Sequence, residues 1–92
     1  MKGKTLRQFI DDLHYNAETE FILHNTKYII SGWTNEDGTY TLSLNTISEN
    51  GNALFGHTAK SRDECVEAFV NAKVFDSKNI YDVEKDIVVL YG

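Results

Sequence analysis

The chain contains no proline and only one cysteine, and it has no long hydrophobic run. Cys65 has no partner for an internal disulfide, which is typical of a reducing compartment. A membrane span requires about 20 apolar residues in succession, and no segment approaches that length. Residues Met1–Lys4 lead into an amphipathic segment, without the hydrophobic region that a signal peptide needs. We therefore expect a cytoplasmic protein that makes no membrane contact.

Basic residues are also scarce, since nine Lys and Arg stand against 14 Asp and Glu, for a net charge of −5. This charge repels phosphate backbones, so direct nucleic-acid binding is unfavourable. The acidity has two interpretations: ordinary solubility, or a surface that binds a basic protein or mimics nucleic acid. Such an acidic patch would use Asp11, Asp12, Glu18, Glu20, Glu36 and Asp37.

The remaining composition is that of one folded domain covering residues 1–92. The 92 residues are 41% hydrophobic and include five Phe, five Tyr and one Trp, too many aromatic side chains for a disordered chain. Few glycines and no prolines interrupt the sequence, and no stretch has the composition of a linker. A chain of this length has room for a single hydrophobic core.

Two segments have the periodicity of amphipathic helices. Each begins with a capping box, and the two boxes are Thr5 with Gln8 and Ser61 with Glu64. The first helix is predicted to end at Asn16 and the second near Lys73. The apolar positions of the two helices are Leu6, Phe9, Ile10 and Leu13, then Cys65, Val66, Ala68, Phe69, Val70 and Ala72.

Between these helices the apolar period changes to two, which is typical of strands. The expected strands are Phe21–Leu23, Lys27–Trp33, Tyr40–Asn45 and Asn52–Thr58. Turn residues separate them at His24–Thr26, Asn35–Gly38 and Glu49–Asn52. The Asp-Gly pair of the middle turn supplies the positive φ that tight hairpin turns require. This part of the chain is therefore predicted to form an antiparallel meander.

The last twenty residues are predicted to add a polar turn at Asp76–Asn79, one helical turn at Ile80–Val83 and a strand at Ile87–Tyr91. The continuous apolar run of that strand suggests burial on both faces or pairing near the sheet centre, and whether it is central or at an edge stays open. The predicted fold is α+β, with two helices on one face of an antiparallel sheet of four to five strands. The element order is α-β-β-β-β-α-β.

Few residues indicate catalysis or ligand binding. Asp11 and His14 share a helix face, but metal-binding spacings are absent and the pair fits a solvated helix surface. Cys65 could act as a nucleophile beside His24 or His57, although its place on an apolar stripe favours packing. The glycines form no phosphate-binding motif. We therefore expect a protein that is not an enzyme and uses no metal or cofactor.

Aromatic residues on the strands are the strongest candidates for a contact surface. Tyr28, Trp33, Tyr40 and Phe55 could form a platform for a peptide or for bases, but Lys27 is the basic residue that accompanies them. Core packing with Trp33 partly exposed is the simpler interpretation. If a protein contact exists, its candidate residues are Trp33, Tyr28 and Tyr40.

The order of motifs resembles that of short uncharacterised proteins from Gram-positive bacteria and their mobile elements. The residues that carry this likeness are Thr5, Leu6, Phe9, Leu13, Glu20-Phe21, Lys27-Tyr28, Ser61, Glu64, Phe69, Lys73, Phe75-Asp76, Lys78 and Ile80. Ser77 stands where the pattern has glycine. The likeness covers most of the chain and implies a fold and a bacterial or phage origin, without implying an activity.

Two hypotheses for function follow. The first is a small non-enzymatic interaction domain that uses its sheet face or a sheet edge to bind another protein, or a second copy of itself as a homodimer. The alternative is an acidic inhibitor or nucleic-acid mimic that binds a basic host protein. The sequence identifies neither the partner nor the biological process.

Overall fold

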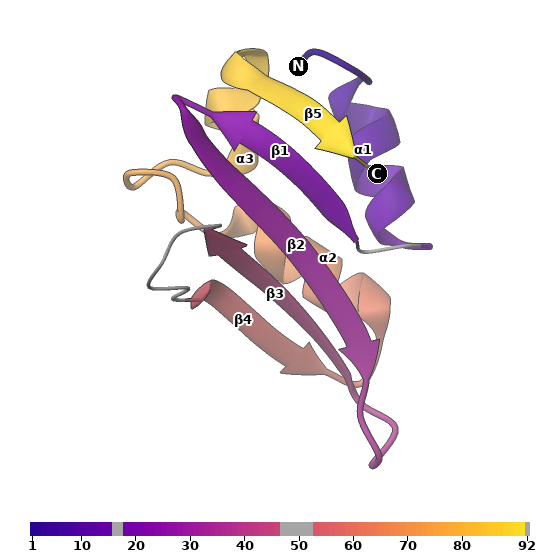
Figure 1. The fold of residues 1–92 in the computed structure, drawn as a ribbon. Helices are drawn as coiled ribbons and strands as arrows, with labels where there is room; N and C mark the ends of the chain where they lie inside the picture. Colours follow the sequence, from indigo (N-terminus) through magenta and orange to yellow (C-terminus); the bar gives the residue numbers. More distant parts are fainter. Residues whose placement is uncertain (16–17, 47–52, 92) are drawn as a thin grey trace.

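The computed structural model describes residues 1–15, 18–46 and 53–91. Its elements are α1 (Leu6–Leu13), β1 (Thr19–Leu23), β2 (Thr26–Thr34), β3 (Tyr40–Thr46), β4 (Ala53–Ala59), α2 (Arg62–Asn71), α3 (Ile80–Val83), the 3-10 helix η1 (Glu84–Asp86) and β5 (Ile87–Tyr91). The strands form one antiparallel sheet in the order β4-β3-β2-β1-β5, and the helices lie on one face of it (Figure 1). The predicted α+β fold and element order are confirmed.

The helices begin where their caps predict. Thr5 Oγ1 accepts a hydrogen bond from Gln8 N at 3.1 Å, and Gln8 Oε1 accepts one from Thr5 N at 2.9 Å. Ser61 Oγ accepts from Glu64 N at 3.2 Å, which is one half of the box predicted there. Helix α2 ends at Asn71, slightly before the predicted end. The predicted helix stop at Asn16 and the predicted turn Glu49–Asn52 lie outside the described residues.

The hairpin turns use positive φ at few positions. His24 and Asn25 join β1 to β2 with φ of 49° and 66°, the two-residue turn that suits the strand twist. Between β2 and β3, Gly38 has a φ of 87° and its N–H donates to the Asn35 carbonyl at 3.0 Å. Asp37 does not share the positive φ, so the predicted Asp-Gly turn forms with the glycine alone in the left-handed region.

In the described part of the chain one hydrophobic core lies between the helices and the sheet, and it includes the fully buried Phe21. The Phe21 ring meets Phe9 edge-on at 5.8 Å, stacks on Tyr28 at 5.2 Å and meets Phe75 at 6.2 Å. Phe21 is contributed by β1 and Phe9 by α1, so these contacts join helix to sheet. The buried apolar residues are Phe9, Leu13, Phe21, Leu23, Ile30, Tyr40, Leu42, Leu44, Cys65, Val66, Phe69, Val70, Phe75, Ile80, Val83 and Ile87.

The structure corrects the interpretation of Ile87–Tyr91 as a strand buried on both faces. The strand lies at an edge of the sheet beside β1, and its side chains alternate in exposure. Ile87 is buried, whereas Val88 is 37% and Leu90 is 48% exposed. The outer edge of β5 is covered by the N-terminus, because Lys2 N donates to the Ile87 carbonyl and Val89 N donates to the Lys2 carbonyl, both at 2.8 Å. The apolar run therefore forms an edge strand whose outer backbone groups are hydrogen-bonded to Lys2.

Candidate interaction surface

The face of the sheet opposite the helices carries no described helix (Figure 1). Along each strand, the side chains of this face alternate with the side chains that point toward the helices. The strand register therefore determines which side chains lie next to each other on it. On β3 and β4 the face is small and polar, with Ser43 opposite Gly56 and Thr41 opposite Thr58. The hydroxyls of Thr41 and Thr58 lie 2.7 Å apart and share a hydrogen bond. On β1, β2 and β5 the face is more apolar, through Ile22, Ile29, Trp33 and Val88.

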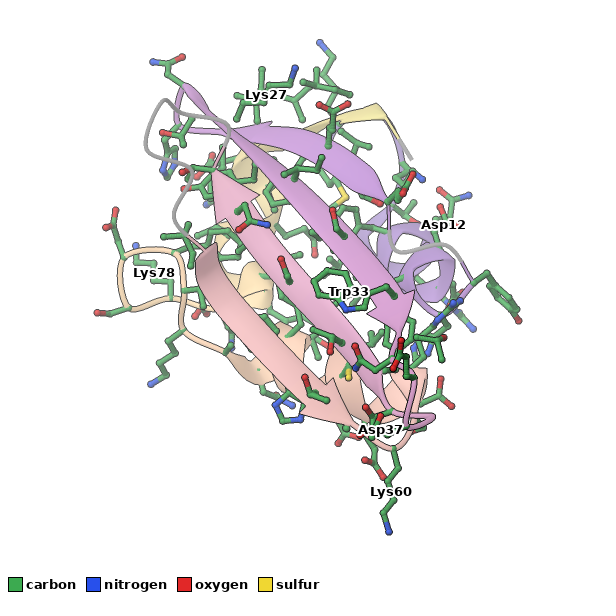
Figure 2. The ribbon with its side chains drawn as sticks, turned by 60° about the horizontal axis from the view of Figure 1, so that its bottom comes forward. Asp12, Lys27, Trp33, Asp37, Lys60 and Lys78 are labelled. Carbon is green, nitrogen blue, oxygen red and sulfur yellow. The ribbon has the colours of Figure 1, made fainter. Side chains whose placement is uncertain are left out.

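Trp33 is the largest exposed side chain of this open face. It is 48% exposed, and Figure 2 shows its ring lying on the sheet. Its Nε1–H donates to Asn35 Oδ1 at 3.0 Å. Asn35 is held in turn, because its Nδ2 donates to Thr39 Oγ1 at 3.0 Å and to Thr41 Oγ1 at 2.9 Å. The indole is therefore presented to solvent in an orientation that hydrogen bonds fix.

The other two predicted contact residues lie on the opposite, helix-covered side of the sheet. Tyr28 is half-buried, and its ring is stacked on Phe21. Burial, with a smaller contribution from the charge of Asp76, raises the pKa of the Tyr28 hydroxyl. Tyr40 is 6% exposed, and the Arg62 guanidinium lies 4.8 Å from its ring centroid. The structure therefore does not bring Tyr28 and Tyr40 together with Trp33 on one surface.

The six acidic residues of the predicted patch are divided among three places. Asp11 and Asp12 are on α1, Glu18 and Glu20 are at the start of β1, and Glu36 and Asp37 are in the β2–β3 turn. Figure 2 shows Asp12 beside α1 and Asp37 at the tip of that turn.

Asp12 and Glu20 pair with cations of the chain. Lys4 Nζ forms an ion pair with Asp12, and Lys27 Nζ lies 3.5 Å from Glu20 Oε1. The ion pairs reduce the negative potential that these two carboxylates present to a partner. The Asp37 carboxylate accepts hydrogen bonds from the hydroxyl and the backbone N–H of Thr39, and these bonds lower its pKa.

Cys65 is fully buried beneath β3 and β4. Its thiol donates to the carbonyl oxygens of Tyr40 and His57 at 3.2 and 3.4 Å, so it contacts the backbone of His57. Burial raises the pKa of the Cys65 thiol, which favours its protonated form. The predicted packing role accounts for this residue.

Two histidines pair with carboxylates that the sequence did not single out. His14 Nδ1 lies 2.6 Å from Asp63 Oδ1, and His24 Nε2 lies 3.1 Å from Asp86 Oδ2. Their partners are 49 and 62 residues away along the chain, so no local spacing could have indicated them. Within residues 1–15, 18–46 and 53–91, no group of three His, Cys, Asp or Glu side chains is arranged to hold a metal ion.

Two hollows lie away from the open face. A cavity of about 380 Å³ is bordered by the β1–β2 turn and the turn after Val74, with Tyr28, Phe75 and Asp76 among its lining residues. A shallower groove of about 290 Å³ lies between α1 and Tyr81, where Leu6 and Ile10 form its floor. The cavity falls within the size range of small-molecule sites, and its lining includes Tyr28 and the ionisable side chains of His24, Asp76 and Lys78.

Comparisons with known proteins assign the chain to no family. No family model, no curated protein and no solved structure matches the chain. Of the helices in the described part of the chain, none has both the length and the hydrophobicity to cross a bilayer.

Proposed function

We propose that the chain is a small non-enzymatic interaction domain that binds a protein partner through the open face of its sheet. The observation that carries this proposal is Trp33, a half-exposed indole whose orientation is fixed by Asn35. Tryptophan is enriched at the centres of protein interfaces because its large ring buries much area and loses little entropy. Ile29 of β2, Ile22 of β1 and Val88 of β5 lie on the same face, and Ser31 separates Ile29 from Trp33 along β2.

The charges of the open face favour a protein partner over a nucleic acid. Glu20 and Lys27 are diagonal neighbours on this face, because β1 and β2 pair Glu20 with Ile29 and Ile22 with Lys27. Lys27 Nζ lies 3.5 Å from Glu20 Oε1, so the two charges offset each other. The small polar side chains beside Trp33 offer hydroxyl groups and no cation for phosphate. The resemblance to short proteins of Gram-positive bacteria and their mobile elements leads us to propose the bacterial cytoplasm as the setting.

A Trp33→Ala variant, with Tyr81→Ala as its matched control, tests the proposal. Both residues are exposed aromatics, at 48% and 52%, but Tyr81 borders the helix-side groove and not the open face. Tagged wild-type and variant chains would be recovered from a Gram-positive host, and each co-purifying protein would then be titrated in purified form. We expect Trp33→Ala to weaken binding at least tenfold, by about 1.4 kcal/mol or more, and Tyr81→Ala to leave it unchanged.

Trp33 also supplies a direct signal, because it is the sole tryptophan of the chain. Partner binding should shift its fluorescence to shorter wavelength as the indole loses water. A partner that binds Trp33→Ala with unchanged affinity, or that leaves the Trp33 emission of the wild type unmoved, would contradict a contact through this face.

A further inference from the structure

The two edges of the sheet are treated differently by the fold. At one edge, the backbone of Lys2 pairs with the outer side of β5 through two hydrogen bonds of 2.8 Å. At the other edge, no described residue pairs with the outer side of β4, and Figure 1 shows no element beyond it. An unpaired edge presents a row of backbone N–H and C=O groups that accept another strand. Only the β4 edge is available in this way among the described strands.

Strand β4 also lacks the devices that usually block such an edge. Natural proteins protect edge strands with charged side chains, prolines or short length. β4 runs for seven residues, ALFGHTA, with neither a charged residue nor a proline. Its one irregularity is the register shift opposite Leu44 and Asn45, close to the start of the strand. The segment from Phe55 to Ala59 is regular and open.

We propose that β4 pairs with β4 of a second copy of this chain, antiparallel about a two-fold axis, to form a continuous ten-stranded sheet. Gly56 is the middle residue of β4, so a pairing centred on it places Phe55 of each copy opposite His57 of the other, within the regular part of the strand. No like charges meet across this axis, although each chain carries a net charge of −5. The acids that produce this charge lie on other elements.

A second copy is a suitable occupant of this edge because two copies of β4 bring no like charges together. A two-fold contact requires each residue to tolerate its symmetric counterpart, and an uncharged strand meets that requirement. At the centre of the strand, a Cβ on Gly56 would meet no atom within 4 Å, so the neighbourhood of the axis is open. This pairing uses the sheet edge, whereas the proposed function uses the open face, so each can hold without the other.

The test is the oligomeric state of three variants and the wild type. Gly56→Lys adds a charge at the middle of the edge without a clash, and Gly56→Thr is the uncharged control at that position. Ser31→Lys adds the same charge to the open face on β2, two strands from the edge. Sedimentation over a concentration series, with circular dichroism to verify folding, measures the dimer dissociation constant.

We expect wild type, Gly56→Thr and Ser31→Lys to reach twice the 10.5 kDa chain mass. Gly56→Lys should weaken the dimer at least tenfold. Hydrogen exchange of the wild type gives a second measurement, because the outward amides of β4 should become more protected as concentration rises.

A wild type that stays monomeric at millimolar concentration, or a dimer unaffected by Gly56→Lys, overturns the proposal. A dimer that Ser31→Lys breaks as strongly as Gly56→Lys also overturns it and assigns self-association to the open face. Loss of partner binding in Trp33→Ala with the dimer intact would separate the two contacts.

Discussion

Asn35 holds the side chain of Trp33, the residue that we propose as the principal contact. Its side chain accepts from the Trp33 indole and donates to the hydroxyls of Thr39 and Thr41, so one amide joins the end of β2 to the start of β3. An exposed tryptophan without such a bond would sample several rotamers, and ordering it on binding would cost free energy. In the binding that we propose, the hydrogen bonds of this turn would reduce that cost.

Hydrogen bonds in the same turn change the pKa of Asp37. The Thr39 hydroxyl and the Thr39 backbone N–H donate to the Asp37 carboxylate at 2.6 and 3.0 Å, which stabilises the charged form. The Asp37 pKa is therefore lowered, first by the hydroxyl and then by the N–H. A lowered pKa in the folded state stabilises the fold. This contribution is complete above the unfolded pKa of about 3.9 and is lost as the pH falls through the folded-state pKa.

Carboxyl chemical shifts followed by NMR between neutral and acidic pH measure this pKa directly. We expect a value below the usual range in the wild type, a rise in Thr39→Val, and retention of the low value in Thr39→Ser, which keeps the hydroxyl. An Asp37 pKa in its ordinary range, or one that Thr39→Val does not move, would show that the hydroxyl bond is absent in solution.

The turn after Val74 contains two residues with positive φ that are not glycine. Asp76 and Ser77 adopt φ of 53° and 66°, a region that favours glycine. The turn nevertheless closes, with two hydrogen bonds of 3.0 Å between Phe75 and Lys78. Burial of the Phe75 ring against Phe21 compensates for the backbone cost, so packing rather than local preference decides this turn.

At the scale of the elements, the pairing of the N-terminal segment with β5 depends on Gly3. Gly3 has a φ of 102°, and a Cβ there would lie 3.0 Å from the Val89 carbonyl oxygen and 3.2 Å from Val89 Cβ. Both the positive φ and the close approach exclude a side chain. The residue that follows Lys2 is thereby required to be glycine if the N-terminus is to lie along the strand.

Gly3→Ala should therefore destabilise the protein by about 1–2 kcal/mol and release the N-terminus from β5. Gly56→Ala is the matched control, because its Cβ meets nothing within 4 Å and its φ is ordinary, so it should be neutral or stabilising by about 0.5–1 kcal/mol. Urea unfolding measures both changes, and hydrogen exchange at the Val89 amide reports release of the edge. Equal stability changes in the two variants would refute this account of Gly3.

Local signals in the sequence predict the elements well, but they do not predict which side of a strand faces the helices. The capping residues Thr5 and Ser61 act within one helical turn, so their role is visible in the sequence. On β2, large side chains occupy both alternating sets, with Tyr28 in one and Trp33 in the other. The choice between the two sets is made by α1 and α2, which contact the sheet from distant positions in the chain. For this reason Tyr28 and Trp33 were grouped by sequence and are separated by the structure.

The edge position of β5 could not be predicted from local sequence either, because it also depends on contacts between distant parts of the chain. A continuous apolar run is typical of a central strand, and Ile87–Tyr91 has that composition. Its outer side is covered by Lys2 from the opposite end of the chain, a pairing that no local pattern encodes. The unprotected β4 edge could be read from its uncharged sequence only once the strand order was known.

At the scale of the whole molecule, the single core makes the open face dependent on contacts on the other side of the sheet. Phe21 on β1 contacts Phe9 of α1, Tyr28 of β2 and Phe75 of the turn after Val74. Since β2 also carries Trp33, loss of these contacts should disorder the face that we propose for binding. Separate unfolding of the helices and the sheet is not expected in a domain of this size.

Phe21→Ala should lower the free energy of unfolding by about 3–5 kcal/mol, because it removes a buried ring and leaves a cavity. Tyr81→Ala, an exposed aromatic substitution, should change it by less than about 0.5 kcal/mol. Domains of this size are stable by about 5–14 kcal/mol, so Phe21→Ala is expected to be marginally folded. Urea unfolding followed by Trp33 fluorescence and by circular dichroism should give coincident midpoints in both variants. Helices that melt before the surroundings of Trp33 change would mean that the open face is independent of the core, and binding through Trp33 would then survive substitutions at Phe21.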